Sequence, residues 1–143
     1  MARSALVALL CFVSATAATA QSDSALIARA RRTPVRSLDS TFAATPLAEW
    51  IAGLRSLPSS RIHWEVNDCG EGGDGRAAPT CVEAILDLAP DTTARVSVIV
   101  ADRTGKPVAP AIFILNAVAG TSVIEFKTLA QWAAFIRPPR RQF

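Results

Sequence analysis

The chain has 143 residues, of which 50% are hydrophobic and 19% are charged, and its formal net charge is +3. A hydrophobic share of this size excludes a chain that is disordered throughout. The length suits one domain with one hydrophobic core.

Residues 1–20 have the pattern of a secretory signal peptide. Arg3 supplies a positive charge, residues 5–13 form an apolar run too short to span a bilayer, and small residues precede a cleavage site after Ala20. Cys11 follows a leucine inside the apolar run, so it does not match a lipoprotein acceptor. We therefore expect an exported mature chain, periplasmic or extracellular, with two cysteines and no transmembrane segment.

Arginines gather near both ends of the mature chain, whereas its body is mildly acidic. They are Arg29, Arg31, Arg32, Arg36, Arg137, Arg140 and Arg141. Basic segments can bind nucleic acid or anionic membranes, but few aromatic residues accompany these, and we expect solvated segments and no nucleic acid. We divide the mature chain into a basic N-terminal segment and linker at 21–44, a single α+β domain at 45–137 and a basic C-terminal tail at 138–143. Residues 22–32 have a small apolar face that would suit a short helix ended by Pro34.

The predicted domain begins with an amphipathic helix. We expect Thr45 to cap it and Pro46 to occupy its first position. Its apolar residues recur at the spacing of one helix face, and they are Leu47, Trp50, Ile51 and Leu54. Pro58 ends this helix.

Alternation of apolar and polar residues then predicts five strands. They lie at 62–67, 81–88, 94–100, 108–118 and 122–126, with turns between them that contain glycine or proline. The fourth stretch is apolar on both faces, which is typical of a central or doubly covered strand.

A last helix begins at Thr128, which forms a capping box with Gln131. Together the elements predict an α+β fold: an antiparallel sheet of four to five strands in meander order, one face covered by an N-terminal and a C-terminal helix, and one disulfide-closed hairpin. This order of elements resembles that of cystatin-like and NTF2-like domains. The resemblance is one of element order and implies no function.

The two cysteines of the mature chain, Cys69 and Cys81, are expected to pair in an oxidising compartment. Both have odd numbers, as do the outward residues of the first two strands, so they share a face. If the cysteines lie directly opposite each other, Asn67 faces Glu83.

The same register places a row of polar residues across three strands. His63 would face Asp87, and a five-residue connection would set Asp87 opposite Arg95. A carboxylate can orient a histidine as a general base, so His63, Glu65 and Asp87 are weak catalytic candidates, with Ser97 as a conceivable nucleophile. No nucleophile-elbow motif supports this chemistry, and we favour an exposed ladder of charges.

A metal site is not favoured either. One histidine without free thiols cannot make a usual zinc site. Asp68, Glu71 and Asp74 are weak calcium candidates, but their spacing fits no EF-hand loop and Arg76 lies beside them as a counter-ion. We expect a solvated turn, with no metal and no cofactor.

Three functions remain open. We favour a non-catalytic binding or interaction module that presents the 70–80 loop, with Glu71, Asp74 and Arg76, to another protein. The first alternative is a binder of a small apolar ligand in a pocket between sheet and helices. Its candidate lining residues, which could equally be core, are Trp50, Trp64, Phe113 and Trp132. The second alternative is a hydrolase-like enzyme that uses His63.

Overall fold

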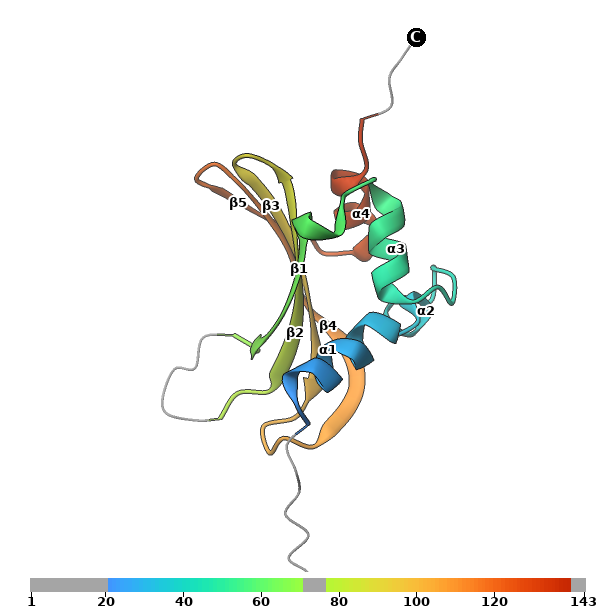
Figure 1. Cartoon of the computed structure of the whole chain (residues 1–143), viewed down its shortest axis with the longest axis vertical. Helices are drawn as coiled ribbons and strands as arrows, with labels where there is room; N and C mark the ends of the chain where they lie inside the picture. The colour runs from blue at the N-terminus through green and yellow to red at the C-terminus, as the bar shows by residue number, and fades with distance from the viewer. Residues whose placement is uncertain (1–20, 71–76, 140–143) are drawn as a thin grey trace, which may run out of the picture.

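A computed structural model of the chain describes residues 21–70 and 77–139. In this part of the chain, five strands form one antiparallel sheet in the order β1-β2-β3-β4-β5. Helices α1 to α4 all lie on the same side of that sheet, and no helix among the described residues covers its other side, called the uncovered face below (Figure 1). The predicted α+β fold, with its meander order, is thereby confirmed.

The strands are joined by short connections. Their bounds are β1 Ile62–Asp68, β2 Thr80–Ala89, β3 Thr92–Ala101, β4 Pro107–Ala119 and β5 Ser122–Glu125. Gly105 and Gly120 take positive φ angles of 83° and 60° in the turns after β3 and β4, a conformation that glycine adopts without steric cost.

The helices begin where the local sequence favours it. Their bounds are α1 Asp23–Arg32, α2 Val35–Leu38, α3 Leu47–Leu54 and α4 Leu129–Ile136, with a short 3-10 helix η1 at Ser59–Arg61. Thr128 Oγ1 accepts from the amide of Gln131 at 3.1 Å, and Gln131 Oε1 accepts from the amide of Lys127 at 3.1 Å. This is the predicted capping box.

The prediction that Thr45 caps α3 is wrong. The N-cap is Pro46, and no side chain caps this helix. The carbonyl of Thr45 instead accepts from the amide of Val35 at 2.9 Å, beside an isolated bridge between Pro34 and Pro46. The chain before α3 is therefore held to α2 by backbone hydrogen bonds.

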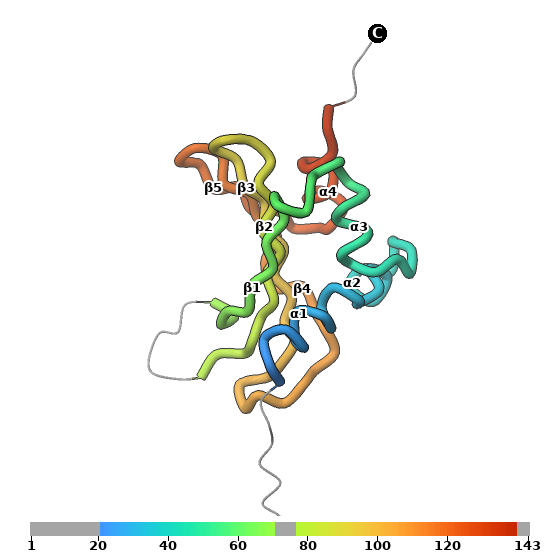
Figure 2. The backbone as a smooth tube through the Cα atoms, in the orientation of Figure 1, coloured from blue at the N-terminus to red at the C-terminus, as the bar shows by residue number. Residues whose placement is uncertain are grey.

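The segment expected as a basic linker contributes to the core. Leu26, Ala30 and Val35 are buried among the helix-facing residues of the sheet. Arg29, expected in solvent, donates through Nη1 to the carbonyl of Val100 at 2.7 Å and through Nη2 to that of Val108. Figure 2 shows α1 following the lower half of the sheet.

The core lies between the sheet and the helices. Trp132 of α4 is fully buried, and its ring stacks on Trp50 of α3 with 6.1 Å between ring centroids. Phe42 meets Trp50 edge-on at 5.2 Å. The indole N–H of Trp132 donates to the carbonyl of Asn116 at 3.2 Å, so this aromatic also has its polar atom satisfied.

Strand β4 contains an extra residue. Val98 pairs with Ile112, and the next residue back along β3, Ser97, pairs with Ile114, which leaves Phe113 over as a bulge. This strand was predicted to be central or covered on both faces: it does lie between β3 and β5, but Phe113 is 41% exposed, so the second alternative is wrong. The bulge explains the misleading pattern, because Ile112 and Ile114 have the same parity yet face opposite sides.

The disulfide Cys69–Cys81 is present, with 5.1 Å between the two Cα atoms, but the register predicted from it is wrong by two residues. Asn67 pairs with Cys81, and Cys69 lies beyond the end of β1, where its amide donates to the carbonyl of Pro79 at 2.8 Å. The disulfide therefore joins diagonal neighbours: Cys81 is bonded to the residue two positions beyond its direct partner, Asn67.

The second predicted register is also wrong. Asp87 pairs with Thr93, and Arg95 pairs with Ile85. The turn after β2 is tighter than expected, with Pro90 and Asp91 at its corner, and a bulge between Asp87 and Ala89 takes up the remaining residue.

No helix within residues 21–70 and 77–139 has the length and apolar character that crossing a membrane would need.

Candidate functional site

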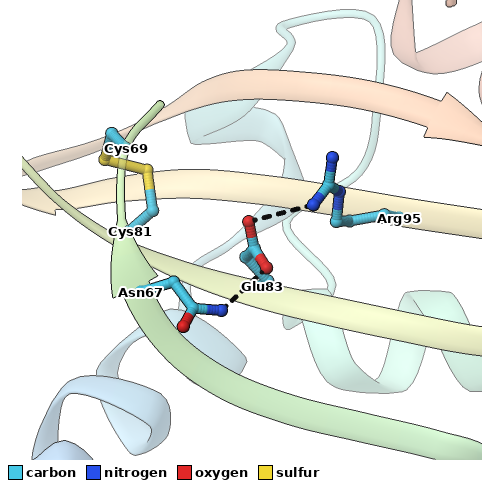
Figure 3. Close-up of a disulfide and its surroundings, with 5 residues drawn as sticks. All are labelled: Asn67, Cys69, Cys81, Glu83 and Arg95. Carbon is cyan, nitrogen blue, oxygen red and sulfur yellow. Dashed lines mark hydrogen bonds and ion pairs between the residues drawn. A yellow bond between two sulfur atoms is a disulfide. The ribbon is translucent and has the colours of Figure 1, made fainter. Parts of the chain in front are cut away.

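The candidate site lies on the uncovered face of the sheet. Glu83 of β2 pairs with Ser97 of β3, and Ser97 pairs with Ile114 of β4, so these three side chains lie in a row across the face. Alternation along the strands puts Arg95 and Asn67 on the same face. Figure 3 shows Asn67, Glu83 and Arg95 converging beside the disulfide.

Glu83 is a nearly buried carboxylate with two partners. Its side chain is 9% exposed, and Oε2 accepts from Asn67 Nδ2 at 2.9 Å (Figure 3). Oε1 lies 3.5 Å from Arg95 Nη1, so the charge is balanced on the face itself. Asn67 Nδ2 also donates to Glu65 Oε2 at 3.2 Å. Arg95 is 36% exposed, and part of its guanidinium faces solvent.

The disulfide holds residues 68–70 over this face, and this segment is called the wall below. It holds the end of β1 over Cys81, which is fully buried although it belongs to the uncovered side. Gly70 follows with a φ angle of 87°, and a Cβ atom built on it would lie 3.5 Å from Cζ of Phe113. The end of β1 thus crosses the face to meet the bulge of β4.

A hollow of about 420 Å³ lies behind this wall. Its lining residues are Asn67, Asp68, Gly70, Glu83, Arg95 and Ile114. Ser97 pairs with Glu83 and Ile114, which line the hollow, but Ser97 itself is fully buried and is not a lining residue. Its hydroxyl has no hydrogen-bond partner among the described residues. Buried hydroxyls are nearly always bonded, so this one needs an explanation.

The weak catalytic candidates do not gather at the hollow. His63 Nε2 lies 3.1 Å from Asp87 Oδ2, and the two side chains are 52% and 44% exposed. Arg95 turns to Glu83 and not to Asp87, and Glu65 is exposed beside Asn67. An exposed pair of this kind contributes about 1 kcal/mol at most.

The loop and metal candidates fall largely outside the described residues. Glu71, Asp74 and Arg76 lie there, and of the calcium candidates only Asp68 is described, at the rim of the hollow. Within residues 21–70 and 77–139, no three side chains of the metal-binding types form a cluster.

The four aromatic pocket candidates are not brought together. Trp50 and Trp132 stack in the core, whereas Phe113 lies on the opposite face of the sheet. Trp64 borders a smaller cleft of about 190 Å³ between β1 and the helices, where the guanidinium of Arg31 lies 5.6 Å from the centre of its ring. The other lining residues of this cleft are Ala48, Ala52, Leu57, Ser59 and Ile62.

Sequence reasoning missed the role of Glu83, Arg95 and Ser97 as a group. All three have odd numbers, and odd-numbered residues of these strands were predicted to face outward. That shared face is the sequence signal from which the group could have been found. Comparison with protein-family models, with curated proteins and with solved structures gives no match, so the site is defined by its own geometry.

Proposed function

We propose that the protein is a non-catalytic binding module whose ligand site is the hollow on the uncovered face of the sheet. The observation that carries this proposal is a hollow of about 420 Å³ in which the nearly buried carboxylate of Glu83 lies between Asn67 and Arg95. The side chain of Arg95 is 36% exposed at this hollow, so its guanidinium can donate to a ligand that enters.

Binding is favoured over catalysis by the state of the polar groups. Glu83 accepts from Asn67 and faces Arg95, which leaves it poorly placed as a general base. His63 and Asp87 lie elsewhere on the face, and neither lines the hollow. The hollow adjoins Gly70 and the disulfide, so a bound ligand would also touch the stapled hairpin.

The test is a binding screen by nuclear magnetic resonance on the ¹⁵N-labelled protein with its disulfide formed. The panel holds sugars, amino acids, nucleotides, inorganic phosphate and short peptides. We expect at least one class to shift the amide signals of Gly70, Glu83, Arg95 and Ser97 in a saturable way. Shifts confined to other parts of the molecule would contradict the proposed site.

The cleft at Trp64 is a second candidate for a small ligand. It has an apolar lining and one cation, Arg31, over an aromatic ring. In the same screen, a ligand of this cleft would shift the indole signal of Trp64 and leave Ser97 unchanged. A Trp64→Leu variant should abolish that response, and a ligand of the hollow should be insensitive to it.

A further inference from the structure

We propose that the free edge of β1 pairs with β1 of a second copy of this chain, antiparallel about a two-fold axis, so that the two sheets become continuous. This inference goes beyond the proposed function, because it concerns the edge of the sheet and not the hollow.

The backbone of β1 has unused hydrogen-bonding groups along the outer edge of the sheet. Within the described residues, β1 pairs with β2 alone. The amide of Cys69 donates to the carbonyl of Pro79 in the register of this pairing, so the odd-numbered residues of β1 direct their backbone groups toward β2. The amides and carbonyls of Trp64 and Val66 therefore point away from the sheet, and no backbone group of residues 21–70 and 77–139 bonds to them.

The opposite edge of the sheet is protected against strand pairing, whereas β1 is not. β5 has only 4 residues and leaves the first part of β4 without a partner on that side. There Pro107 and Pro110 lack an N–H group, and the bulge at Phe113 interrupts the strand. Arg29 also donates to the carbonyl of Val108. By contrast, β1 runs over 7 residues with no proline, glycine or register shift, and such an edge is a template for another strand.

The charges of β1 are complementary to themselves when two copies run antiparallel. Arg61 and His63 lie at its start, whereas Glu65 and Asp68 lie toward its end. An antiparallel pair sets each start against the end of the other strand, and a two-fold axis repeats that match. A parallel pair would set like charges side by side, which is unfavourable. This order of charges favours a second copy over an unrelated extended segment.

One register suits both faces and the backbone. With Trp64 on the two-fold axis, His63 lies opposite Glu65 of the second copy on the uncovered face. On the helix side, Ile62 lies opposite Val66, and the half-buried Trp64 meets its own counterpart. The two Trp64 residues then exchange backbone bonds, and the amide of each Val66 donates to the carbonyl of Ile62 in the other copy.

Neighbouring registers lose part of this match. An axis at Glu65 sets two carboxylates directly opposite each other. An axis at Val66 sets Glu65 opposite Asn67 and leaves His63 outside the paired strands. An axis at His63 sets two imidazoles opposite each other and shortens the pairing. The register centred on Trp64 is therefore the expected one.

The two charged side chains keep atoms for this contact. Nε2 of His63 lies 3.1 Å from Asp87 Oδ2, which leaves Nδ1 for a carboxylate of the second copy. A charged imidazole donates from both nitrogens. Glu65 accepts from Asn67 through Oε2, which leaves Oε1 for His63 of the second copy.

The experiment measures the mass of the disulfide-bonded protein by sedimentation equilibrium at mildly acidic pH, which favours charged histidine. The concentrations run from about 10 μM to about 1 mM, the range in which a weak dimer dissociates. We expect the mass to rise toward that of two chains. Hydrogen exchange at the amides of Trp64 and Val66 should slow as the concentration rises. The amide of Val123, at the opposite edge, is the internal control and should not change.

A mixture of isotope-labelled and unlabelled protein identifies the register. Opposite residues of an antiparallel pair lie closest where they do not exchange backbone hydrogen bonds. We therefore expect a nuclear Overhauser contact between Hα of His63 in one copy and Hα of Glu65 in the other.

Charge reversal tests the same register. Glu65→Lys sets a lysine opposite His63 and should weaken association about tenfold or more, because the symmetry repeats the unfavourable pair. His63→Glu added to that variant restores opposite charges and should recover the dimer. Glu125→Lys is the matched control, the same change at an exposed position of β5, and should leave association unchanged. The amide spectrum of each variant shows whether its fold is retained.

Three results would overturn the inference. The first is the mass of a single chain over the whole concentration range. The second is a dimer in which the amides of Trp64 and Val66 still exchange fast, or which Glu65→Lys does not weaken, because another surface then forms it. The third is a monomer in which an added peptide of alternating valine and threonine protects these two amides. The edge would then accept a strand, and a second copy would be the wrong occupant.

Discussion

Ser97 is a buried polar residue whose side chain works against the stability of the fold. Its hydroxyl is buried on a sheet face that no helix covers, and none of the described residues bonds to it. An alanine would occupy the same space without a polar atom, and it would be the better residue for folding alone. The serine therefore costs the fold a buried polar group that no described residue satisfies.

Replacing Ser97 by alanine should leave the free energy of unfolding unchanged or raise it by about 1 kcal/mol. Urea unfolding followed by circular dichroism measures the difference. Ser122→Ala, at an exposed position in β5, is the control and should stay within about 0.5 kcal/mol. A loss of stability in Ser97→Ala would mean that the hydroxyl is bonded in the free protein.

The sequence predicts which face of the sheet each site residue occupies. It predicts only some of the contacts between their side chains. Asn67 meets Glu83 and His63 meets Asp87, as the assumed register suggested, although the observed register differs by two. Side chains of this length reach diagonal neighbours, so these contacts survive the error. The missing partner of Ser97 could not be predicted, because it depends on which side chains pack around that atom.

At the scale of elements, Arg29 attaches α1 to the sheet. It bonds to the carbonyls of Val100 and Val108, where the pairing of β3 with β4 is irregular between Ile99 and Ala101. Carbonyls that leave a ladder need another donor when they are buried. The planar guanidinium can serve two of them at once, which a lysine cannot do in the same geometry.

Arg29→Ala should therefore lower the free energy of unfolding by about 2 kcal/mol, and Arg29→Lys should recover less than half of that loss. Thermal and urea unfolding both measure it. Arg32→Ala, at an exposed position in the same helix, is the matched control with an expected change within about 0.5 kcal/mol. Equal effects of the two alanine variants would contradict the role of Arg29.

The turn between β3 and β4 contains a carboxylate, Asp102, whose pKa is lowered by hydrogen bonds within the turn. The hydroxyl and the amide of Thr104, and then the amide of Lys106, donate to Asp102 Oδ1 at 2.6, 2.9 and 3.0 Å. These bonds hold the pKa of Asp102 below its ordinary value of 3.8, the side-chain bond from Thr104 most of all. Their stabilisation is complete above pH 3.8 and is lost as the pH falls through the lowered pKa.

A carboxyl titration by nuclear magnetic resonance should place the midpoint of Asp102 below 3.8. Thr104→Ala removes the bond with the largest effect, so it should move the midpoint upward. Thr121→Ala, in the turn before β5, serves as the control and should leave it in place. A midpoint that does not respond to Thr104→Ala would show that the hydroxyl does not bond to Asp102 in solution.

The same scale shows why strand positions were easier to predict than registers. Alternation marks a strand wherever one face is buried, and the capping box of Thr128 and Gln131 marks a helix start. The bulge between Asp87 and Ala89 leaves the alternation readable but shifts the pairing with β3, and the bulge at Phe113 makes β4 look apolar on both faces. The core role of α1 was missed because its arginines, at positions 29, 31 and 32, predict a solvated helix, whereas Arg29 bonds to two carbonyls of the sheet.

At the scale of the molecule, one layer of helices covers a sheet whose other face depends on the disulfide. The hollow exists because the end of β1 is held over the face, with Gly70 against Phe113. The disulfide therefore stabilises the fold and shapes the candidate site.

Removing the disulfide with Cys69→Ala and Cys81→Ala should lower the free energy of unfolding by about 3 kcal/mol, as expected for a short loop. Nuclear Overhauser contacts between Gly70 and the Phe113 ring should disappear in the folded double variant. The shift of Trp132, buried on the helix side, serves as the internal control for an intact core. Persistence of the Gly70 contacts would show that the wall forms without the disulfide.

The bulge in β4 has a consequence for how this sheet can vary in length. Without Phe113, Ile112 would still face Val98 and Ile114 would still face Ser97, so both sides of the sheet would keep their residues. Loss of Asn116 would instead turn Ala117 outward and Val118 into the core. Deletion of Phe113 should therefore change the wall of the hollow, where Gly70 meets this ring, while the helix-facing core stays the same.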